Sequence, residues 1–202
     1  MASSQPEILT AAPLVLPAEL GPYRRRDYSE LPERSTCELI LGRFYARVRP
    51  SIGHEIVLET AWRHLRAIAT ETCGRAYRGP LELELAVHSV VKPDLFFLSA
   101  GRRDLLVLEQ RNATPDLIVE LLSPKTARQD RREKVALYAG CGVKEYWLID
   151  PEAWLVDLLV NEGGRFVLSL PNGDLHDSPA IAGVTLDLAA FWRDVEKEWP
   201  IL

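Results

Sequence analysis

Apolar and polar positions repeat along the chain with two different periods, and the longer period predicts a long helix. From Ile52 to about Thr72, apolar residues recur roughly every 3.6 positions, which is the spacing of one face of an α-helix. Ser51 is a suitable N-cap residue, and Gly74 follows the last apolar position. We therefore predict a helix over residues 52–72.

The shorter period, of two residues, predicts strands. Residues 81–88 alternate strictly between apolar and polar, which predicts a half-buried strand whose acidic side faces solvent. Residues 117–122 are almost continuously apolar, which is typical of a strand covered on both faces. Other strands are expected at 94–98, 105–109, 145–150 and 184–188, with hairpins over 37–48, turning near Gly42, and over 154–170.

The order of these elements indicates the fold class. A helix predicted over residues 126–139 lies between the strands at 117–122 and 145–150, and this arrangement implies a crossover between parallel neighbours. A short helix or turn is expected at 24–31, and a last helix at 188–197. The sequence therefore predicts an α/β protein with a mixed β-sheet flanked by helices.

Length and composition indicate one domain. The chain has 202 residues, of which 47% are hydrophobic, and this is enough for one ordinary core. Residues 1–22 contain four prolines and predict an extended N-terminal arm, which leaves residues 23–202 as the domain.

No apolar run reaches the roughly 20 residues of a membrane span, so no membrane association is expected. The N-terminus lacks the pattern of a secretory signal, and the three scattered cysteines predict reduced thiols. The cytoplasm is therefore the expected location.

Two carboxylates stand within apolar strands. Asp94 precedes the apolar run 95–98, and Glu120 lies in the middle of 117–122. Buried carboxylates seldom lack a partner. If the two strands are neighbours, both acids can bind one Mg²⁺ or Mn²⁺, with the Leu121 carbonyl as a further oxygen ligand. The alternatives are structural: Asp94 caps a turn, or Glu120 pairs with an arginine such as Arg128.

A basic segment follows Glu120, although the net charge of the chain is −5. Its members are Lys125, Arg128, Arg131, Arg132 and Lys134. One interpretation is a solvated helix face. The other is that Lys134 stabilises charge at a phosphorus atom while Arg128, Arg131 and Arg132 contact phosphates.

Several of these segments together carry a resemblance to a known family. They are Cys37-Glu38-Leu-Ile, Val91-Lys-Pro-Asp94, Pro115-Asp-Leu-Ile-Val-Glu120-Leu-Leu-Ser-Pro124, Asp130-Arg-Arg-Glu-Lys134 and Gly142-Val-Lys-Glu-Tyr-Trp-Leu-Ile-Asp-Pro151. From about Tyr28 to Phe191 the chain resembles the Uma2 family, formerly DUF820, of the PD-(D/E)XK restriction-endonuclease-like proteins. The resemblance implies a restriction-endonuclease-like core, Mg²⁺-dependent cleavage of DNA and a homodimer.

The resemblance also implies roles for individual residues. Asp94 and Glu120 match the metal-binding acids, and Lys134 looks like the catalytic lysine displaced onto the following helix. Glu38 matches an early acidic position and is expected to be a third ligand or an orienting group. Tyr138, one turn after Lys134, can hydrogen-bond beside it. His54, near a helix start, is interpreted as a helix residue rather than a ligand.

Two departures from the family pattern raise an alternative. Leu41-Gly42-Arg43 replaces an Asp-Gly-Glu turn, and Lys92 replaces a glutamine. If Lys92 and Asp94 share a strand face, the lysine is a substitute catalytic cation or partly neutralises the site without metal. The alternative function is a catalytically inactive nuclease-fold module for binding or assembly.

Overall fold

The structure, a computed structural model, describes residues 20–102 and 114–199. Its helices are α1 (Arg25–Ser29), the 3-10 turn η1 (Arg34–Thr36), α2 (Ile52–Glu71), α3 (Ala127–Arg131), α4 (Glu133–Gly140) and α5 (Leu188–Glu198). Its strands are β1 (Cys37–Ile40), β2 (Arg43–Ala46), β3 (Arg75–Arg78), β4 (Leu83–Ala86), β5 (Ser89–Val91), β6 (Leu95–Leu98), β7 (Leu117–Leu121), β8 (Glu145–Asp150), β9 (Leu155–Glu162), β10 (Arg165–Leu168), β11 (Leu175–Asp177) and β12 (Thr185–Asp187). No helix within the described ranges is long and apolar enough to cross a membrane.

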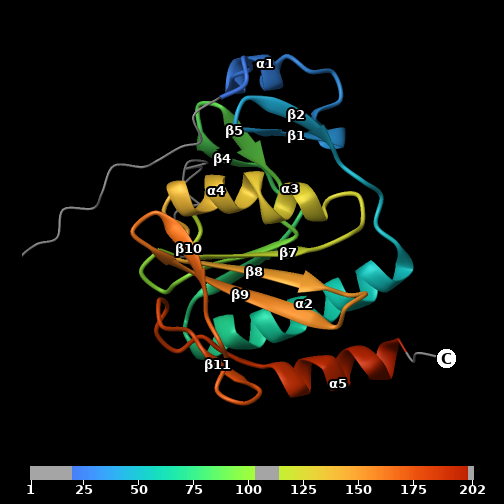
Figure 1. Cartoon of the computed structure of the whole chain (residues 1–202), viewed down its shortest axis with the longest axis vertical. Coiled ribbons are helices and arrows are strands. Elements are labelled where there is room, and N and C mark those ends of the chain that lie inside the picture. Colours follow the sequence, from blue (N-terminus) through green and yellow to red (C-terminus); the bar gives the residue numbers. More distant parts are fainter. Residues whose placement is uncertain (1–19, 103–113, 200–202) are drawn as a thin grey trace, which may run out of the picture.

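A six-stranded mixed sheet forms the centre of the fold, in the order β10-β9-β8-β7-β6-β3. Strands β7 and β8 are parallel, as the strand-helix-strand order predicts, and the other neighbours are antiparallel. Helices α2 and α5 cover one face of this sheet, and α4 covers the other (Figure 1). A second sheet, in the order β2-β1-β5-β4, packs on the far side of α4. The predicted α/β class is confirmed.

Strand β7 divides its side chains between the two cores. Leu117, Val119 and Leu121 join the cluster against α2 and α5, whereas Ile118 and Leu122 join the cluster against α4. This is the alternation expected of a strand buried on both faces. By the same alternation, the α4 side of the sheet carries the one ionisable side chain of β7, at position 120.

Several local predictions are confirmed. Helix α2 begins after Ser51, whose hydroxyl accepts a hydrogen bond from the His54 N–H at 3.2 Å. The β1–β2 hairpin turns at Leu41 and Gly42, whose φ angles are 49° and 78°. Positive φ at both turn residues suits the twist of a two-residue hairpin loop, and glycine adopts it without strain. The β9–β10 hairpin and helix α5 also lie where they were expected.

The single strand predicted over residues 81–88 is wrong. Only residues 83–86 form β4, after which the chain turns and returns as β5. Val87, at an apolar position of the alternation, is 63% exposed because it lies in that turn. Strands β3, β5 and β11 were not predicted. The strand expected at 105–109 and residues 1–19 of the expected arm lie outside the described residues.

The helix predicted over residues 126–139 is divided into α3 and α4. At Arg132 the backbone has φ −127° and ψ −75°, which is outside the helical region. The carbonyl of Asp130, two residues earlier, accepts a hydrogen bond from the Tyr146 hydroxyl at 3.2 Å. This bond occupies a carbonyl that an uninterrupted helix would use for its own ladder. The two short helices therefore replace one long one.

Asp116, a buried acid directly before β7, connects this strand to the residues that follow β6. Asp116 is fully buried and accepts bonds from the Ser99 N–H, Arg102 and Lys144, each at 2.9 Å. Burial alone would raise the pKa of Asp116, but the Ser99 N–H and O–H groups and the two cations outweigh burial and lower this pKa. The ionised form is therefore stabilised by the fold.

We expect Asp116→Asn to lower the free energy of unfolding at pH 7 by about 2 kcal/mol, because hydrogen bonds to a buried charged acceptor are weakened and two partly exposed cations lose their partner. The pKa of Asp116 is lower in the folded state than in the unfolded state, so its contribution is complete above about pH 4 and is lost as the pH falls further. Urea unfolding at pH 7 and pH 3 measures this difference. A destabilisation that stays constant over this range would contradict the assignment.

Candidate active site

The two acids that the sequence singles out lie side by side on neighbouring strands. Leu95 of β6 pairs with Val119 of β7, so Asp94 and Glu120 occupy the next opposing positions. The Asp94 Oδ2 atom accepts a hydrogen bond from the Leu121 N–H at 2.9 Å. Both acids line a cleft of about 870 Å³. The prediction that these two strands are neighbours is confirmed.

A close backbone contact fixes the position of Asp94. The Gly79 N–H, just after β3, donates to the Asp94 carbonyl at 2.8 Å. A Cβ atom at Gly79 would lie 2.3 Å from the Pro93 carbonyl oxygen, so no other residue fits without a shift of the backbone. The glycine thereby holds the end of β3 against the start of β6, where the acid stands.

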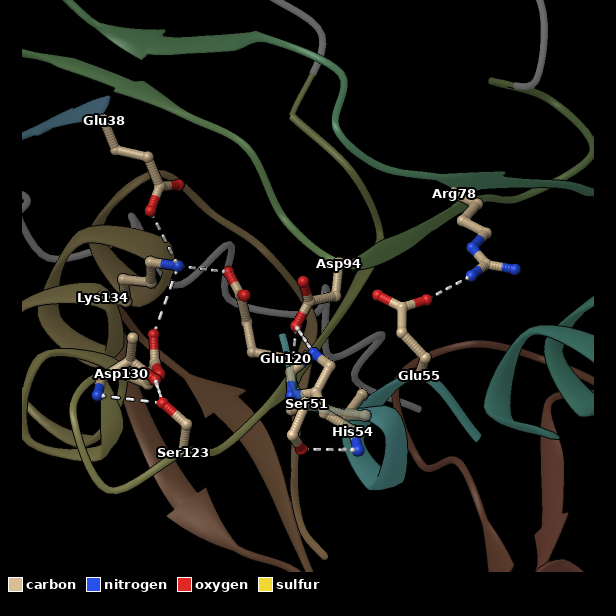
Figure 2. A network of polar contacts seen from close by, with 12 residues as sticks. Glu38, Ser51, His54, Glu55, Arg78, Asp94, Glu120, Ser123, Asp130 and Lys134 are labelled. Atoms are coloured by element: carbon tan, nitrogen blue, oxygen red, sulfur yellow. Dashed lines mark hydrogen bonds and ion pairs between the residues drawn. The ribbon is translucent and has the colours of Figure 1, made fainter. Parts of the chain in front are cut away.

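Lys134 of α4 lies at the centre of a group of carboxylates (Figure 2). Its Nζ atom is 2.7 Å from Glu120 Oε1, 3.2 Å from Asp130 Oδ1 and 3.4 Å from Glu38 Oε2. The lysine is only 3% exposed. Burial alone would lower the pKa of Lys134, but the three carboxylates outweigh burial and raise it well above its usual value. The ammonium therefore stays charged inside the protein.

Two further contacts orient this group. The Tyr138 hydroxyl donates to Glu120 Oε1 at 2.8 Å, as its place one turn after Lys134 predicts. Burial, and then the Glu120 charge, raise the pKa of Tyr138 well above its usual value, so the phenol keeps its proton. Glu38 Oε1 accepts the Lys92 N–H at 2.6 Å, which ties β1 to the end of β5. Glu38 contacts Lys134 directly, and its role as a third ligand or an orienting group stays a prediction.

The acids of the site resist ionisation. Burial raises the pKa of Asp94, against the opposing effects of the Leu121 N–H and His54. Burial also raises the pKa of Glu120 well above its usual value, and Asp94 adds to this while Lys134 opposes it. Three carboxylates, Glu38, Glu120 and Asp130, thus surround one ammonium, and Asp94 stands on the neighbouring strand. Another cation in the cleft would relieve this excess of negative charge.

The donor atoms fit a hard divalent cation that keeps water ligands. Among residues 20–102 and 114–199, no group of three or more His, Cys, Asp or Glu side chains is arranged to hold a metal. Mg²⁺ is commonly bound by one or two carboxylates, completed by waters and a substrate phosphate. Asp94 and Glu120 supply such a pair. The predicted contribution of the Leu121 carbonyl stays a prediction.

Two residues of the site were missed or undervalued by sequence reasoning. Asp130 was not predicted, although its position four residues before Lys134 on a helical segment is a signal for an ion pair. His54 was interpreted as a helix residue, and it does lie in the first turn of α2. Its Nε2 atom is also 4.0 Å from Asp94 Oδ2, with the side chain 16% exposed at the cleft.

Comparisons with known proteins identify the family and the fold. The sequence model of the Uma2 family, described as "Putative restriction endonuclease", matches residues 25–189. The chain belongs to the Uma2 family.

A crystal structure of a "putative nuclease belonging to DUF820" from Anabaena variabilis has the same fold as this Uma2 protein. The TM-score is 0.70 at 18% identity, and the match covers 86% of this chain and 99% of the other. No curated protein is significantly similar in sequence. The fold class implied by the resemblance is confirmed.

Lys92, a departure from the Uma2 pattern, does not act on the acid pair. Its Nζ atom donates to the carbonyls of Arg34 and Cys37, the latter at 3.0 Å, and lies 3.6 Å from Glu82 Oε1. These contacts direct the ammonium toward η1 and β1. These contacts therefore support neither role predicted for Lys92, that of a substitute catalytic cation or that of a partial neutraliser of the site.

The arginines expected to contact phosphates lie elsewhere on this Uma2 fold. Arg128, Arg131 and Arg132 are exposed, and none of them lines the cleft. Arg131 is paired with Asp157 of β9 and lies 3.9 Å from Asp150. Their predicted role has no support from the geometry of the cleft.

We expect Lys134→Met to lower the free energy of unfolding by about 3–5 kcal/mol, because buried carboxylates lose their cation. In the double variant Lys134→Met/Glu120→Leu the cost is expected to be smaller than the sum of the two single costs, by about 0.5–3 kcal/mol. Urea unfolding at pH 7 measures each variant.

Arg131→Met is the matched control for this cycle, because it removes a cation from a more exposed pair and is expected to cost no more than about 1 kcal/mol. Equal costs for Lys134→Met and Arg131→Met would contradict the central place given to Lys134.

Proposed function

We propose that the protein is a metal-dependent endonuclease that hydrolyses phosphodiester bonds in DNA. One observation carries this proposal: two neighbouring carboxylates, the half-buried Asp94 and the buried Glu120, line a cleft beside a buried, charged lysine. Membership of a family described as restriction endonucleases supports it further.

Asp94 and Glu120 would hold Mg²⁺ or Mn²⁺, whose oxygen-ligand preference they match. When bound, such an ion supplies a Lewis acid and lowers the pKa of a coordinated water. The raised pKa values of Asp94 and Glu120 mean that these two carboxylates take up protons easily when no metal is bound. Metal and protons therefore compete for the same oxygens.

The other residues keep the charges of the site in place. Lys134 opposes the rise in the pKa of Glu120 and carries positive charge at the wall of the cleft, where charge develops on phosphate oxygens during hydrolysis. Glu38 and Asp130 fix the ammonium, and Tyr138 fixes one oxygen of Glu120. Because these groups are buried, their electrostatic effects are larger than in water.

We expect the purified protein to nick or cleave plasmid DNA with Mg²⁺ or Mn²⁺ and to be inactive in EDTA. Asp94→Ala and Glu120→Gln are each expected to lower the rate at least about 10²-fold, because the metal loses a ligand. Gel electrophoresis of the products measures the rate.

Asp174→Asn and Glu162→Gln change exposed acids outside the cleft and serve as controls. If these controls lose as much activity as the site variants, or if no metal supports cleavage, the proposal fails.

We expect 1 mM Mn²⁺ to raise the Tm, because the ion binds the folded state; at 100 times its dissociation constant it would add about 2.7 kcal/mol. The increase in Tm should grow between pH 5 and pH 8, because the raised pKa values of Asp94 and Glu120 leave protons to be displaced at the lower pH. Differential scanning fluorimetry measures this shift. The same increase in Asp94→Asn as in the unaltered protein would contradict metal binding at this pair.

A catalytically inactive binding or assembly module is the second candidate. It is favoured by the departures from the family pattern at Leu41, Arg43 and Lys92 and by the net charge of −5. Salt-sensitive DNA binding that is unchanged in Asp94→Ala and is not followed by cleavage would support this candidate. The homodimer and the cytoplasmic location stay predictions; light scattering and cell fractionation test them.

A further inference from the structure

The cleft beside the acid pair contains more basic side chains than the site chemistry uses. These are Arg47, Arg49, Arg78, Lys92, Lys125 and Lys134. Three of them are neutralised by acids: Arg78 pairs with Glu59 and with Glu55 at 3.0 Å, Lys92 approaches Glu82, and Lys134 contacts its three carboxylates.

The other three basic residues are differently placed. Within residues 20–102 and 114–199, Arg47, Arg49 and Lys125 form no ion pair. Arg49 and Lys125 are exposed, and Arg47 is half-buried. Their positive charges are therefore available to a ligand in the cleft.

These residues come from two segments that meet at the acid pair. Arg47 and Arg49 lie on the connection between β2 and α2, just before the Ser51 that caps the helix carrying His54. Lys125 lies on the connection between β7 and α3, five residues after Glu120. Both segments line the same cleft as Asp94 and Glu120.

A polyanion entering this cleft meets a cluster of carboxylates, which repels phosphate. Binding therefore needs unpaired cations beside the cluster, and arginine is well suited because its guanidinium forms two parallel bonds to a phosphate. Arg47, Arg49 and Lys125 meet this requirement. Arg131, by contrast, is neutralised by Asp157, and Arg128 and Arg132 lie outside the cleft lining.

We infer that Arg47, Arg49 and Lys125 bind the backbone phosphates on either side of the phosphodiester bond presented to Asp94 and Glu120. This inference rests on the proposed function, because it takes a nucleic-acid strand as the occupant of the cleft. It places strand binding on the two connections rather than on helix α3, where the sequence alone suggested it. The nucleic-acid strand to be cut would then lie along one cleft of the protein.

Two triple variants with the same change of charge test this inference. The cleft variant is Arg47→Gln/Arg49→Gln/Lys125→Gln, and the helix variant is Arg128→Gln/Arg131→Gln/Arg132→Gln. Fluorescence anisotropy measures the binding of labelled DNA, either a single strand of about 20 nucleotides or a duplex of about 20 base pairs. The buffer contains EDTA, so that no metal supports cleavage, and the salt concentration is varied over roughly 50–200 mM.

The cleft variant is expected to bind at least about 10-fold more weakly, and its slope of log K against log salt to fall by about two to three, because three phosphate contacts are lost. The helix variant is expected to bind within about twofold of the unaltered protein. Equal effects of the two variants, or a larger effect of the helix variant, would overturn the inference. If the unaltered protein binds neither DNA, the inference is overturned as well.

Folding and cleavage are measured separately. If the cleft triple variant has a lowered Tm, the single variants Arg49→Gln and Lys125→Gln, at exposed positions, replace it. For each of them the slope of log K against log salt is expected to fall by about one. If only the cleft variant binds DNA more weakly, and the unaltered protein shows no metal-dependent cleavage, the inference is supported and the proposed endonuclease function is rejected. Cleavage by the unaltered protein, with both triple variants binding alike, would reject the inference alone.

Discussion

The buried ammonium of Lys134 is the interaction on which the arrangement of the site depends. Glu120 lies in the middle of a strand covered on both faces, which is among the least favourable positions for a charge, and burial favours its neutral form over a negative charge. The lysine stabilises that charge, and Glu38 and Asp130 in turn stabilise the lysine. Removing the lysine would therefore leave several buried carboxylates without their cation, whereas removing Glu38 or Asp130 would leave the lysine with two partners.

The topology explains how the lysine reaches the acids. Parallel pairing of β7 and β8 requires a crossover, and that crossover contains α4, which lies on the sheet face that Glu120 occupies. Antiparallel pairing of β6 with β7, on the edge of β7 opposite β8, places Asp94 next to Glu120. The site thus combines a crossover helix with the ends of two neighbouring strands, and the Gly79 contact prevents β6 from shifting along β3.

The sequence alone could predict the groups whose signals are local. Glu120 stood out because it interrupts an apolar run, and Lys134 because it follows in the next helix. Lys92 was misjudged because it was assigned to the same strand as Asp94. In fact β5 ends at Val91 and β6 begins at Leu95, in different sheets, so the alternation of side chains does not extend across Pro93. The roles inferred for Arg47 and Arg49 depend on two connections, far apart in the sequence, that line the same cleft, for which no local pattern exists.

The contact between Glu38 and Lys134 also determines when the site can exist. Glu38 is on β1, near the start of the domain, whereas Lys134 and Tyr138 are on α4, in its later half. A growing polypeptide contains Glu38, Asp94 and Glu120 well before it contains their cation. The acid cluster therefore remains incomplete during synthesis until α4 has emerged and packed between the two sheets.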